Sequence, residues 1–231
     1  MNWIYTEENP LRVFEAFAGY GSQAMAIRNL GIPYKVVGIS EIDKNAITAY
    51  MAVHGGTPNY GDISKVDWTE VPDFDLFTYS FPCTDISNAG VQMGFAEGSG
   101  TRSSLLWECK RAIEVKKPTF LLMENVKALV SEKFLPGYHQ WVDYPTRQGY
   151  TSFTEILNAK DYGIPQNRER VFMVSISGSA WFSFPQPREL KLKLKDVLEE
   201  NVEEKYYLDD SKVAEFIGQL EEDKKRLICK D

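Results

Sequence analysis

The residues Leu11-Arg12-Val13-Phe14-Glu15-Ala16-Phe17-Ala18-Gly19-Tyr20-Gly21 decide the fold class of this chain. The first four residues predict a short apolar strand that runs into a glycine turn. Gln23 to Leu30 then has apolar side chains at helical spacing, and Gly31 is a typical C-terminal stop. Strand, glycine turn and helix open a nucleotide-binding β-α-β unit, in which glycines let the backbone approach a ligand at the helix amino terminus. A complete GxGxxG motif is absent, so these residues predict either a ligand site or an ordinary tight turn.

Acidic residues follow the next extended segments. After the predicted strand Tyr34 to Ile39, Glu41 lies about 20 residues beyond the glycine turn, where such folds bind a ribose hydroxyl with a carboxylate. Carboxylates at this position also cap helices, and we expect Asp43 to cap the helix Lys44 to Met51 while Glu41 binds the ligand. Asp62 ends another extended piece, where it either accepts from an adenine amino group or caps a turn.

Cys83 follows a further apolar run, Phe74 to Tyr79. Because Pro82 prevents further ladder pairing, the cysteine lies at the carboxyl end of a strand, where open α/β sheets bind their ligands. A cysteine at this position is either a small buried hydrophobe or a nucleophile. The segment Asn88 to Ser103 is rich in glycine and lacks periodicity, which is typical of a mobile lid.

A second buried strand, Thr119 to Met123, ends in Glu124. This glutamate is either a solvated cap or a carboxylate brought to the same sheet edge as Cys83. Arg168 and Arg170 stand at alternate positions and share a face if the chain is extended. They are either solvated or, beside a carboxylate-bearing cleft, they grip phosphate or orient a buried acid.

The remaining periodicity predicts further elements, with Cys109 in the core of the first of them. These are an amphipathic helix over Leu105–Val115, a helical or irregular region over Ser131–Tyr150 interrupted by Pro136 and Pro145, strands over Thr151–Leu157 and Arg170–Ile176, a charged helix over Leu190–Glu200 with Leu194, Val197 and Leu198 facing inward, and a last helix from about Asp210 to Leu227.

Composition restricts the class of protein. The chain has 231 residues, 43% of them hydrophobic, enough for one globular domain with a small appendage. Its three cysteines, Cys83, Cys109 and Cys229, form no CxxC pair, and His54 and His139 lie in no ligand spacing, so we expect neither a disulfide framework nor a metal site. No signal pattern or long apolar run occurs, which favours a cytoplasmic protein without membrane partners. The net charge of −7 argues against a broadly basic nucleic-acid-coating protein, but it is compatible with a locally basic cleft.

Short motifs in a fixed order between Leu11 and Pro187 identify a family. The motifs are Phe17-Ala18-Gly19-Tyr20-Gly21, Glu41-Ile42-Asp43, Gly61-Asp62-Ile63, Phe81-Pro82-Cys83, Arg102-Ser103-Ser104-Leu105, Glu124-Asn125-Val126 and Gln166-Asn167-Arg168-Glu169-Arg170. The ordered set resembles the cytosine-C5 DNA methyltransferases, the modification enzymes of bacteria and phages that take part in restriction–modification. The resemblance implies an α/β fold with a doubly wound, Rossmann-like sheet. It also implies methyl transfer from S-adenosylmethionine to carbon 5 of cytosine in double-stranded DNA.

The resemblance assigns the cofactor site residue by residue. Phe17, Gly19 and Gly21 would line the methionine end, Glu41 would bind the ribose hydroxyls, Ile42 would pack on the adenine, Asp62 and Ile63 would recognise the adenine amino group, and Pro82 and Leu105 would complete the wall.

The resemblance also assigns the catalytic residues. Cys83 would add to carbon 6 of the cytosine, Glu124 would hold N3 and the exocyclic amine, and Arg168 and Arg170 would fix that carboxylate, the target carbonyl or a flanking phosphate. Substrate contacts are expected from Ser87, Asn125 and Gln166. Because the target atom is inaccessible in a duplex, the base would be flipped, and the loop of residues 87–102 would close over it.

The chain departs from the family pattern in two respects. Thr84 replaces the usual glutamine after the cysteine, from which we expect a change in the behaviour of the loop without loss of activity. Family members continue past Lys205-Tyr206-Tyr207 into a target-recognition domain, whereas here a short tail follows. We therefore expect a cofactor-binding and catalytic domain over residues 1–187 and a charged helical tail over residues 188–231.

The short tail leaves several interpretations open. The chain is half of a split methyltransferase that needs a second polypeptide, a truncated enzyme, or a non-catalytic remnant that binds cofactor or a partner. Self-association through the exposed cofactor side and a tRNA substrate remain further alternatives.

Overall fold

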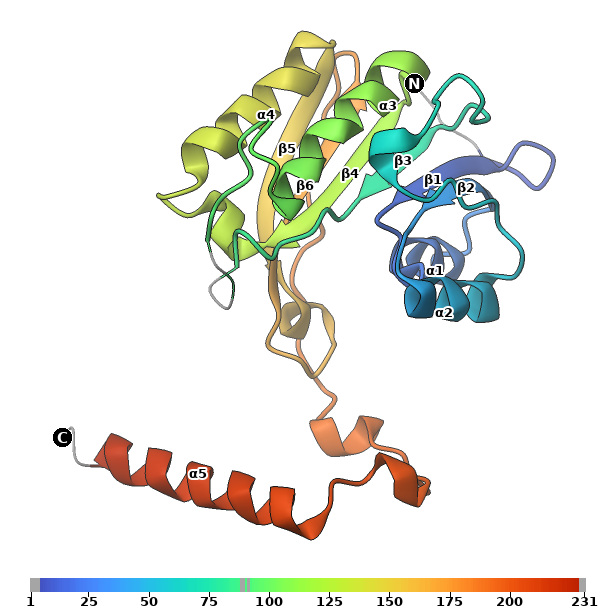
Figure 1. Cartoon of the computed structure of the whole chain (residues 1–231). Coiled ribbons are helices and arrows are strands. Elements are labelled where there is room, and N and C mark those ends of the chain that lie inside the picture. Colours follow the sequence, from blue (N-terminus) through green and yellow to red (C-terminus); the bar gives the residue numbers. More distant parts are fainter. Residues whose placement is uncertain (1–4, 88–89, 91, 229–231) are drawn as a thin grey trace. The chain divides into compact units, whose positions relative to one another are not determined.

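The computed structural model describes residues 5–87, 90 and 92–228, and the chain divides into two compact units, residues 1–190 and 191–231. The first unit is built on one six-stranded sheet (Figure 1). Its strands are β1 (Leu11–Ala16), β2 (Tyr34–Ser40), β3 (Leu76–Tyr79), β4 (Phe120–Val126), β5 (Tyr150–Asn158) and β6 (Glu169–Ser177), and its helices are α1 (Ser22–Asn29), α2 (Lys44–His54), α3 (Cys109–Lys116) and α4 (Leu135–Arg147).

The strand order β2-β1-β3-β4-β6-β5 confirms the doubly wound fold class. β1, β2, β3 and β4 run parallel, whereas β6 is antiparallel to both β4 and β5. From β1 the chain moves outward to β2 and then returns to the other side of β1 to form β3. The sheet therefore has its topological switch point between β1 and β3, and the carboxyl ends of these two strands border the ligand crevice of such sheets.

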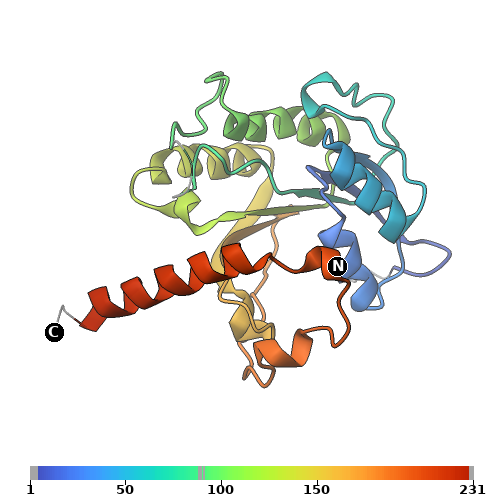
Figure 2. The same cartoon turned by 60° about the horizontal axis from the view of Figure 1, so that its bottom comes forward.

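The reversal of strand order also distributes the helices. Right-handed crossovers in opposite directions place their helices on opposite faces of the sheet. Figure 2 shows α1 on one face and α3 and α4 on the other. Most buried side chains lie on the α3 and α4 side, in an aromatic core that includes Phe14, Phe77 and Trp141. On the α1 side, Val13 packs with Ile27, and the sheet face over β4 and β6 is only half-buried.

Several predicted boundaries change for local reasons. Cys109 is fully buried, as predicted, but its helix begins there, because residues 102–108 form a 3₁₀ turn. Glu124 lies inside β4 rather than after it. The predicted interruption by Pro136 and Pro145 is wrong, since both lie within α4. Pro136 occupies the first turn, where its missing N–H needs no intrahelical acceptor, and Pro145 lies in the last turn.

The second unit contains α5 (Asp210–Ile228) and two 3₁₀ turns. The predicted helix over Leu190–Glu200 is wrong: only Leu194–Val197 makes a 3₁₀ turn, and Leu194, Val197 and Leu198 are 65%, 53% and 64% exposed. Every residue from 191 to 222 is exposed. Helices without a packed face are marginal below about 12–15 residues, so the short segment 190–200 forms no helix, whereas α5, with 19 residues, does. Within the described part of the chain, none of the helices has the length and hydropathy needed to cross a bilayer.

Candidate active site

The glycine turn after β1 adopts a left-handed backbone at several positions. Phe17, Gly19 and Gly21 have φ values of 56°, 57° and 81°. The Phe17 amide donates to the Ser40 carbonyl at 2.8 Å, and the Gly21 amide closes the turn by donating to Ala18 at 2.9 Å. Phe17 is a non-glycine residue at positive φ, a conformation that persists only where surrounding contacts hold it, and such residues cluster at functional sites.

Glu41 bridges the crevice between the ends of β1 and β2. Its carboxylate accepts hydrogen bonds from the backbone amides of Gly19 at 2.9 Å, Ile42 at 2.8 Å and Asp43 at 2.9 Å. The predicted cap is confirmed, because the Asp43 side chain accepts from the Ala46 amide at the start of α2. Glu41 therefore fixes the glycine turn. A carboxylate has about four acceptor positions, so that of Glu41 can accept a further hydrogen bond from a ligand hydroxyl.

A cavity of about 160 Å³ opens beside Glu41. Most of its exposed lining is apolar, and its charged groups are the carboxylates of Glu41, Asp43 and Asp62 and the guanidinium of Arg102. The Asp62 carboxylate accepts from the Ser64 hydroxyl at 2.8 Å and from the Ser64 amide at 3.1 Å, and these hydrogen bonds lower the pKa of Asp62. The predicted cofactor residues that line this cavity are Phe17, Glu41, Ile42, Asp62, Ile63, Pro82 and Leu105.

A second cavity, of about 540 Å³, begins at Phe17 on the α1 side of the sheet. It runs along the first turn of α1, where Gly19 lines it, to Glu124 and Arg168 at the far end. The two cavities share Phe17, so one lies on the Asp62 side of this residue and the other extends toward Glu124. Open space lies where a side chain on Gly19 would project, which leaves room for a ligand against the backbone.

Gly21 is placed differently from the other predicted cofactor residues. It lines neither cavity, and a Cβ at this position would approach His54 Nε2 to 2.3 Å and the Tyr50 ring to 2.7 Å. The glycine is therefore needed for close packing against α2 as well as for its left-handed backbone.

The turn after β3 carries the predicted nucleophile. Cys83 is half-buried, and its carbonyl accepts from the amides of Ile86 at 3.0 Å and Ser87 at 2.8 Å. Ser103 ties this turn to the chain beyond the loop: its hydroxyl donates to the Pro82 carbonyl at 2.7 Å. The buried Asp85 carboxylate in turn accepts from the Ser103 amide at 3.0 Å. The cysteine is thus held from both sides by a short hydrogen-bonded turn.

Glu124 and Arg170 meet on neighbouring antiparallel strands. Register pairs Glu124 with Phe172 and Val126 with Arg170, so the two charged side chains are diagonal neighbours on one face of the sheet. Arg170 Nε lies 3.1 Å from Glu124 Oε1, and both side chains are about one-fifth exposed, at 23% and 22%. The arginine therefore orients the carboxylate while leaving part of it open to the cavity.

Asn125, predicted to contact substrate, is buried and bonded at both ends. Its Nδ2 donates to the Phe81 carbonyl at 2.9 Å, and its Oδ1 accepts from the Val126 amide at 2.8 Å. Asn125 therefore connects β4 to the turn that carries Cys83, and its contact with substrate stays a prediction.

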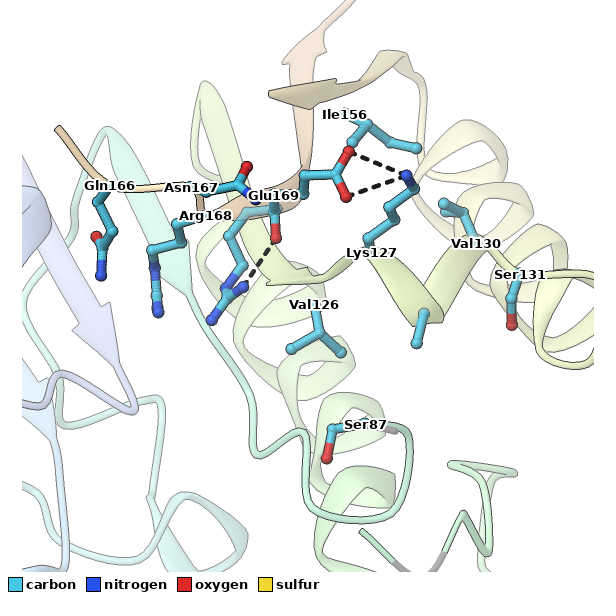
Figure 3. Close-up of a pocket in the computed structure, with 12 residues that line it drawn as sticks. Ser87, Val126, Lys127, Val130, Ser131, Ile156, Gln166, Asn167, Arg168 and Glu169 are labelled. Carbon is cyan, nitrogen blue, oxygen red and sulfur yellow. Dashed lines mark hydrogen bonds and ion pairs between the residues drawn. The ribbon is translucent and has the colours of Figure 1, made fainter. Parts of the chain in front are cut away.

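A third cavity, of about 660 Å³, lies beside the Cys83 turn (Figure 3). Ser87 and Gln166, two predicted substrate residues, line it together with Arg168 and Arg170. Figure 3 shows Gln166 and Arg168 projecting in the same direction, whereas Glu169 turns away toward Lys127, with which it forms an ion pair at 3.0 Å. Arg168 lines both this cavity and the one that reaches Phe17.

The predicted lid falls partly outside the described residues, which omit Asn88, Ala89 and Val91. Its described residues are fixed at several points. The Gly94 amide donates to the Asp85 carbonyl at 2.8 Å, and Trp107 Nε1 donates to the Phe95 carbonyl at 2.6 Å. Phe95 is buried in the core.

Glu15, Asp85 and Ser103 are not among the predicted site residues, although each is buried beside the site. The sequence does contain a signal for Glu15, which is a single carboxylate inside an apolar strand. Such a residue indicates a functional or structural role, because buried charges are rare unless they are paired or hydrogen-bonded. The described residues contain no group of three or more His, Cys, Asp or Glu side chains placed to hold a metal ion.

Comparison with known proteins agrees with the order of the motifs. The sequence pattern of the C-5 cytosine-specific DNA methylase family matches residues 11–226. The chain is 43% identical to the type II methyltransferase M2.ScrFI of Lactococcus lactis subsp. cremoris, over 89% of this chain and 72% of that protein. It is 33% identical to the orphan methyltransferase M.Rho11sI of Bacillus phage rho11s, over 94% of this chain and 49% of that protein.

Solved structures share the fold at lower sequence identity. An Entamoeba histolytica methyltransferase, EhMeth, superposes with a TM-score of 0.72 at 17% identity, covering 87% of this chain and 63% of that one. The Dnmt2 methyltransferase of S. pombe gives a TM-score of 0.68 at 22% identity, covering 87% and 63%. The chain thus spans between about half and three-quarters of the length of these relatives.

Proposed function

We propose, because this chain belongs to the C-5 cytosine-specific DNA methylase family, that it provides the catalytic domain for transfer of a methyl group to carbon 5 of cytosine in DNA. The observation that carries the proposal is the convergence of three features at one sheet edge. The Cys83 turn follows β3, the Glu124–Arg170 pair lies on β4 and β6, and the cavity at Phe17 follows β1.

The residues at Phe17 fit S-adenosylmethionine. The smaller cavity offers apolar walls for an adenine ring between Ile63 and Leu105, with Asp62 as acceptor for its amino group and Glu41 near the ribose. The larger cavity leads from Gly19 toward Glu124 and suits the methionine end. When bound, this cofactor would supply an electrophilic methyl group from its sulfonium ion, and S-adenosylhomocysteine would be the leaving group.

Cys83 is proposed as the nucleophile. Its thiolate adds to carbon 6 of the cytosine, forming an S–C bond while the electron pair of the 5,6 double bond moves into the ring and makes carbon 5 nucleophilic. After carbon 5 has accepted the methyl group, its proton is lost to solvent, the S–C bond breaks, and the double bond re-forms. The thiolate is regenerated, so the cysteine is not consumed.

Glu124 and the arginines are proposed to stabilise the charge that develops on addition. Glu124 would hold N3 and the exocyclic amine, and Arg170 keeps its carboxylate oriented. Arg168 would contact the target carbonyl or a flanking phosphate. The cytosine reaches this position only as a flipped base, for which the cavity lined by Ser87 and Gln166 offers the entrance.

The test is methyl transfer from labelled S-adenosylmethionine to duplex DNA carrying many cytosine contexts, followed by identification of 5-methylcytosine in the digested DNA. The expected result is a product that Glu124→Gln reduces by about 10² or more while Glu155→Gln, an exposed glutamate on β5, leaves it unchanged. Methylation of tRNA with none of DNA would overturn the proposed substrate.

A further inference from the structure

Glu15 is a fully buried carboxylate directly beneath the glycine turn, and the proposed chemistry does not use it. It lies on β1, which pairs on both sides, and its side chain points to the α1 face. Its register partners are Ile39 on β2 and Thr78 on β3, and neither is titratable. Unpaired buried carboxylates are costly, so the contacts that satisfy Glu15 show what the residue does.

One contact of Glu15 reaches the first turn of α1. Oε1 accepts from the Ala24 amide at 3.1 Å. The N-cap of this helix is Gly21, which has no side chain and makes no capping hydrogen bond of its own. Helix N-termini need acceptors for their first N–H groups and favour negative charge. Glu15 therefore supplies from β1 the cap that Gly21 lacks.

The other contact reaches α2. Oε2 accepts from the Tyr50 hydroxyl at 2.6 Å, and Tyr50 is fully buried. The ring of Tyr50 packs on His54 with centroids 4.5 Å apart, and His54 Nε2 lies 3.1 Å from the Tyr20 carbonyl in the glycine turn. Tyr50 and His54, both on α2, are the titratable groups that face Glu15. The same two rings form the surface against which Gly21 packs.

We propose that Glu15 is a positioning residue for cofactor binding: by capping α1 and anchoring Tyr50, it holds the glycine turn of residues 17–21 in its binding geometry. The inference rests on the proposed function, because the ligand is taken to be S-adenosylmethionine. Glu15 does not touch either cavity and acts through the turn. Burial raises the pKa of Glu15, whereas the hydrogen bonds from Tyr50 and Ala24 lower it, which agrees with a carboxyl group held by two donors in an apolar site.

The test compares Glu15→Gln and Tyr50→Phe with the unchanged chain by titration calorimetry with S-adenosylmethionine and by amide hydrogen exchange without ligand. Glu15→Gln replaces one of two carboxylate acceptors by an NH2 donor, and Tyr50→Phe removes the donor to Oε2, so we expect the Kd to rise about tenfold in each. Exchange should accelerate at the amides of residues 22–24.

Val13→Ala is the control for general destabilisation. Val13 is equally buried on the same strand and packs on Ile27, away from the glycine turn. It should lower stability without changing the Kd. Equal affinity for Glu15→Gln and the unchanged chain, or an equal loss in Val13→Ala, would overturn the inference. If the unchanged chain binds no cofactor, the proposed function fails, and the exchange rates at residues 22–24 still decide whether Glu15 holds the turn.

Discussion

Two turns border the crevice of this sheet, and they are held by different chemistry. The glycine turn after β1 is supported from beneath by the buried carboxylate of Glu15 and from the side by Glu41. The Cys83 turn after β3 is held by two neutral side chains, the hydroxyl of Ser103 and the amide of Asn125, and by its own carboxylate, Asp85. Changes at Glu15 or Glu41 should therefore affect ligand binding at the first turn, while removal of the Ser103 or Asn125 hydrogen bonds should affect chemistry at the second.

The largest expected effect is a loss of methyl transfer at the Cys83 turn that leaves cofactor binding at the glycine turn unchanged. Cys83→Ala should reduce methyl transfer by at least about 10³-fold, because no other group provides the nucleophile, while cofactor affinity stays unchanged. Cys109→Ala is the matched control, since Cys109 is fully buried in α3 and is not among the residues that line the three cavities of the site. It should reduce stability slightly and leave kcat unchanged. Rate measurements with saturating cofactor check both variants, and retention of activity in Cys83→Ala would contradict the assignment.

The next largest effect compares two glycines of the same turn. Gly21→Ala should cost about 3 kcal/mol or more of unfolding free energy, because the new Cβ meets His54 and Tyr50 in addition to the strained backbone. Gly19→Ala meets no atom within 4 Å, and we expect about 1 kcal/mol from its backbone alone. Urea unfolding measures both values. Equal losses would show that α2 does not support the turn.

A smaller effect is expected at the Cys83 turn. Ser103→Ala removes the donor to the Pro82 carbonyl and should cost about 1–3 kcal/mol of stability, with a lower kcat and an unchanged cofactor Kd. Ser152→Ala serves as the control, because this hydroxyl bonds to Ser175 on the far strands of the sheet. A rise in Kd that matches the fall in kcat would mean that the turns are not independent.

The smallest effect is a difference in pH dependence between two carboxylates. Burial raises the native pKa of Glu15 above its ordinary value of 4.5, so its contribution to stability is present at low pH and is lost as pH rises through the native pKa. For Asp75, burial alone would raise the pKa, but the hydrogen bonds and charge of Arg12 lower it below 3.8. Its contribution is present above that value and is lost as pH falls through the native pKa.

The direction of each pH dependence is tested by measuring the free energy of unfolding from about pH 3 to about pH 8. The difference between the unchanged chain and Glu15→Gln should shrink as pH rises. The difference for Asp75→Asn should shrink only at the acidic end. If both stability differences changed with pH in the same direction, the raised pKa of Glu15 would be contradicted.

Sequence patterns predicted the parts of this fold that depend on local order. The strand end before Cys83 follows from an apolar run and from Pro82. The same reasoning ended β4 too early, because Glu124 pairs with Phe172 inside the strand. Glu15 was not predicted, because its role depends on Tyr50, 35 residues away in the chain. The helix expected over Leu190–Glu200 is absent because a segment this short is marginal as a helix when its side chains are exposed, whereas α5 is longer, with 19 residues.

The measurement that most directly tests the central claim is covalent trapping on duplex DNA that carries 5-fluorocytosine in many contexts, with S-adenosylmethionine present. Fluorine at carbon 5 prevents the final elimination, so an enzyme that works through Cys83 remains attached to the DNA. The account predicts an adduct whose peptide map identifies Cys83 and which is absent from Cys83→Ser. Methylation of ordinary cytosine without any such adduct, or an adduct that persists in Cys83→Ser, would contradict it.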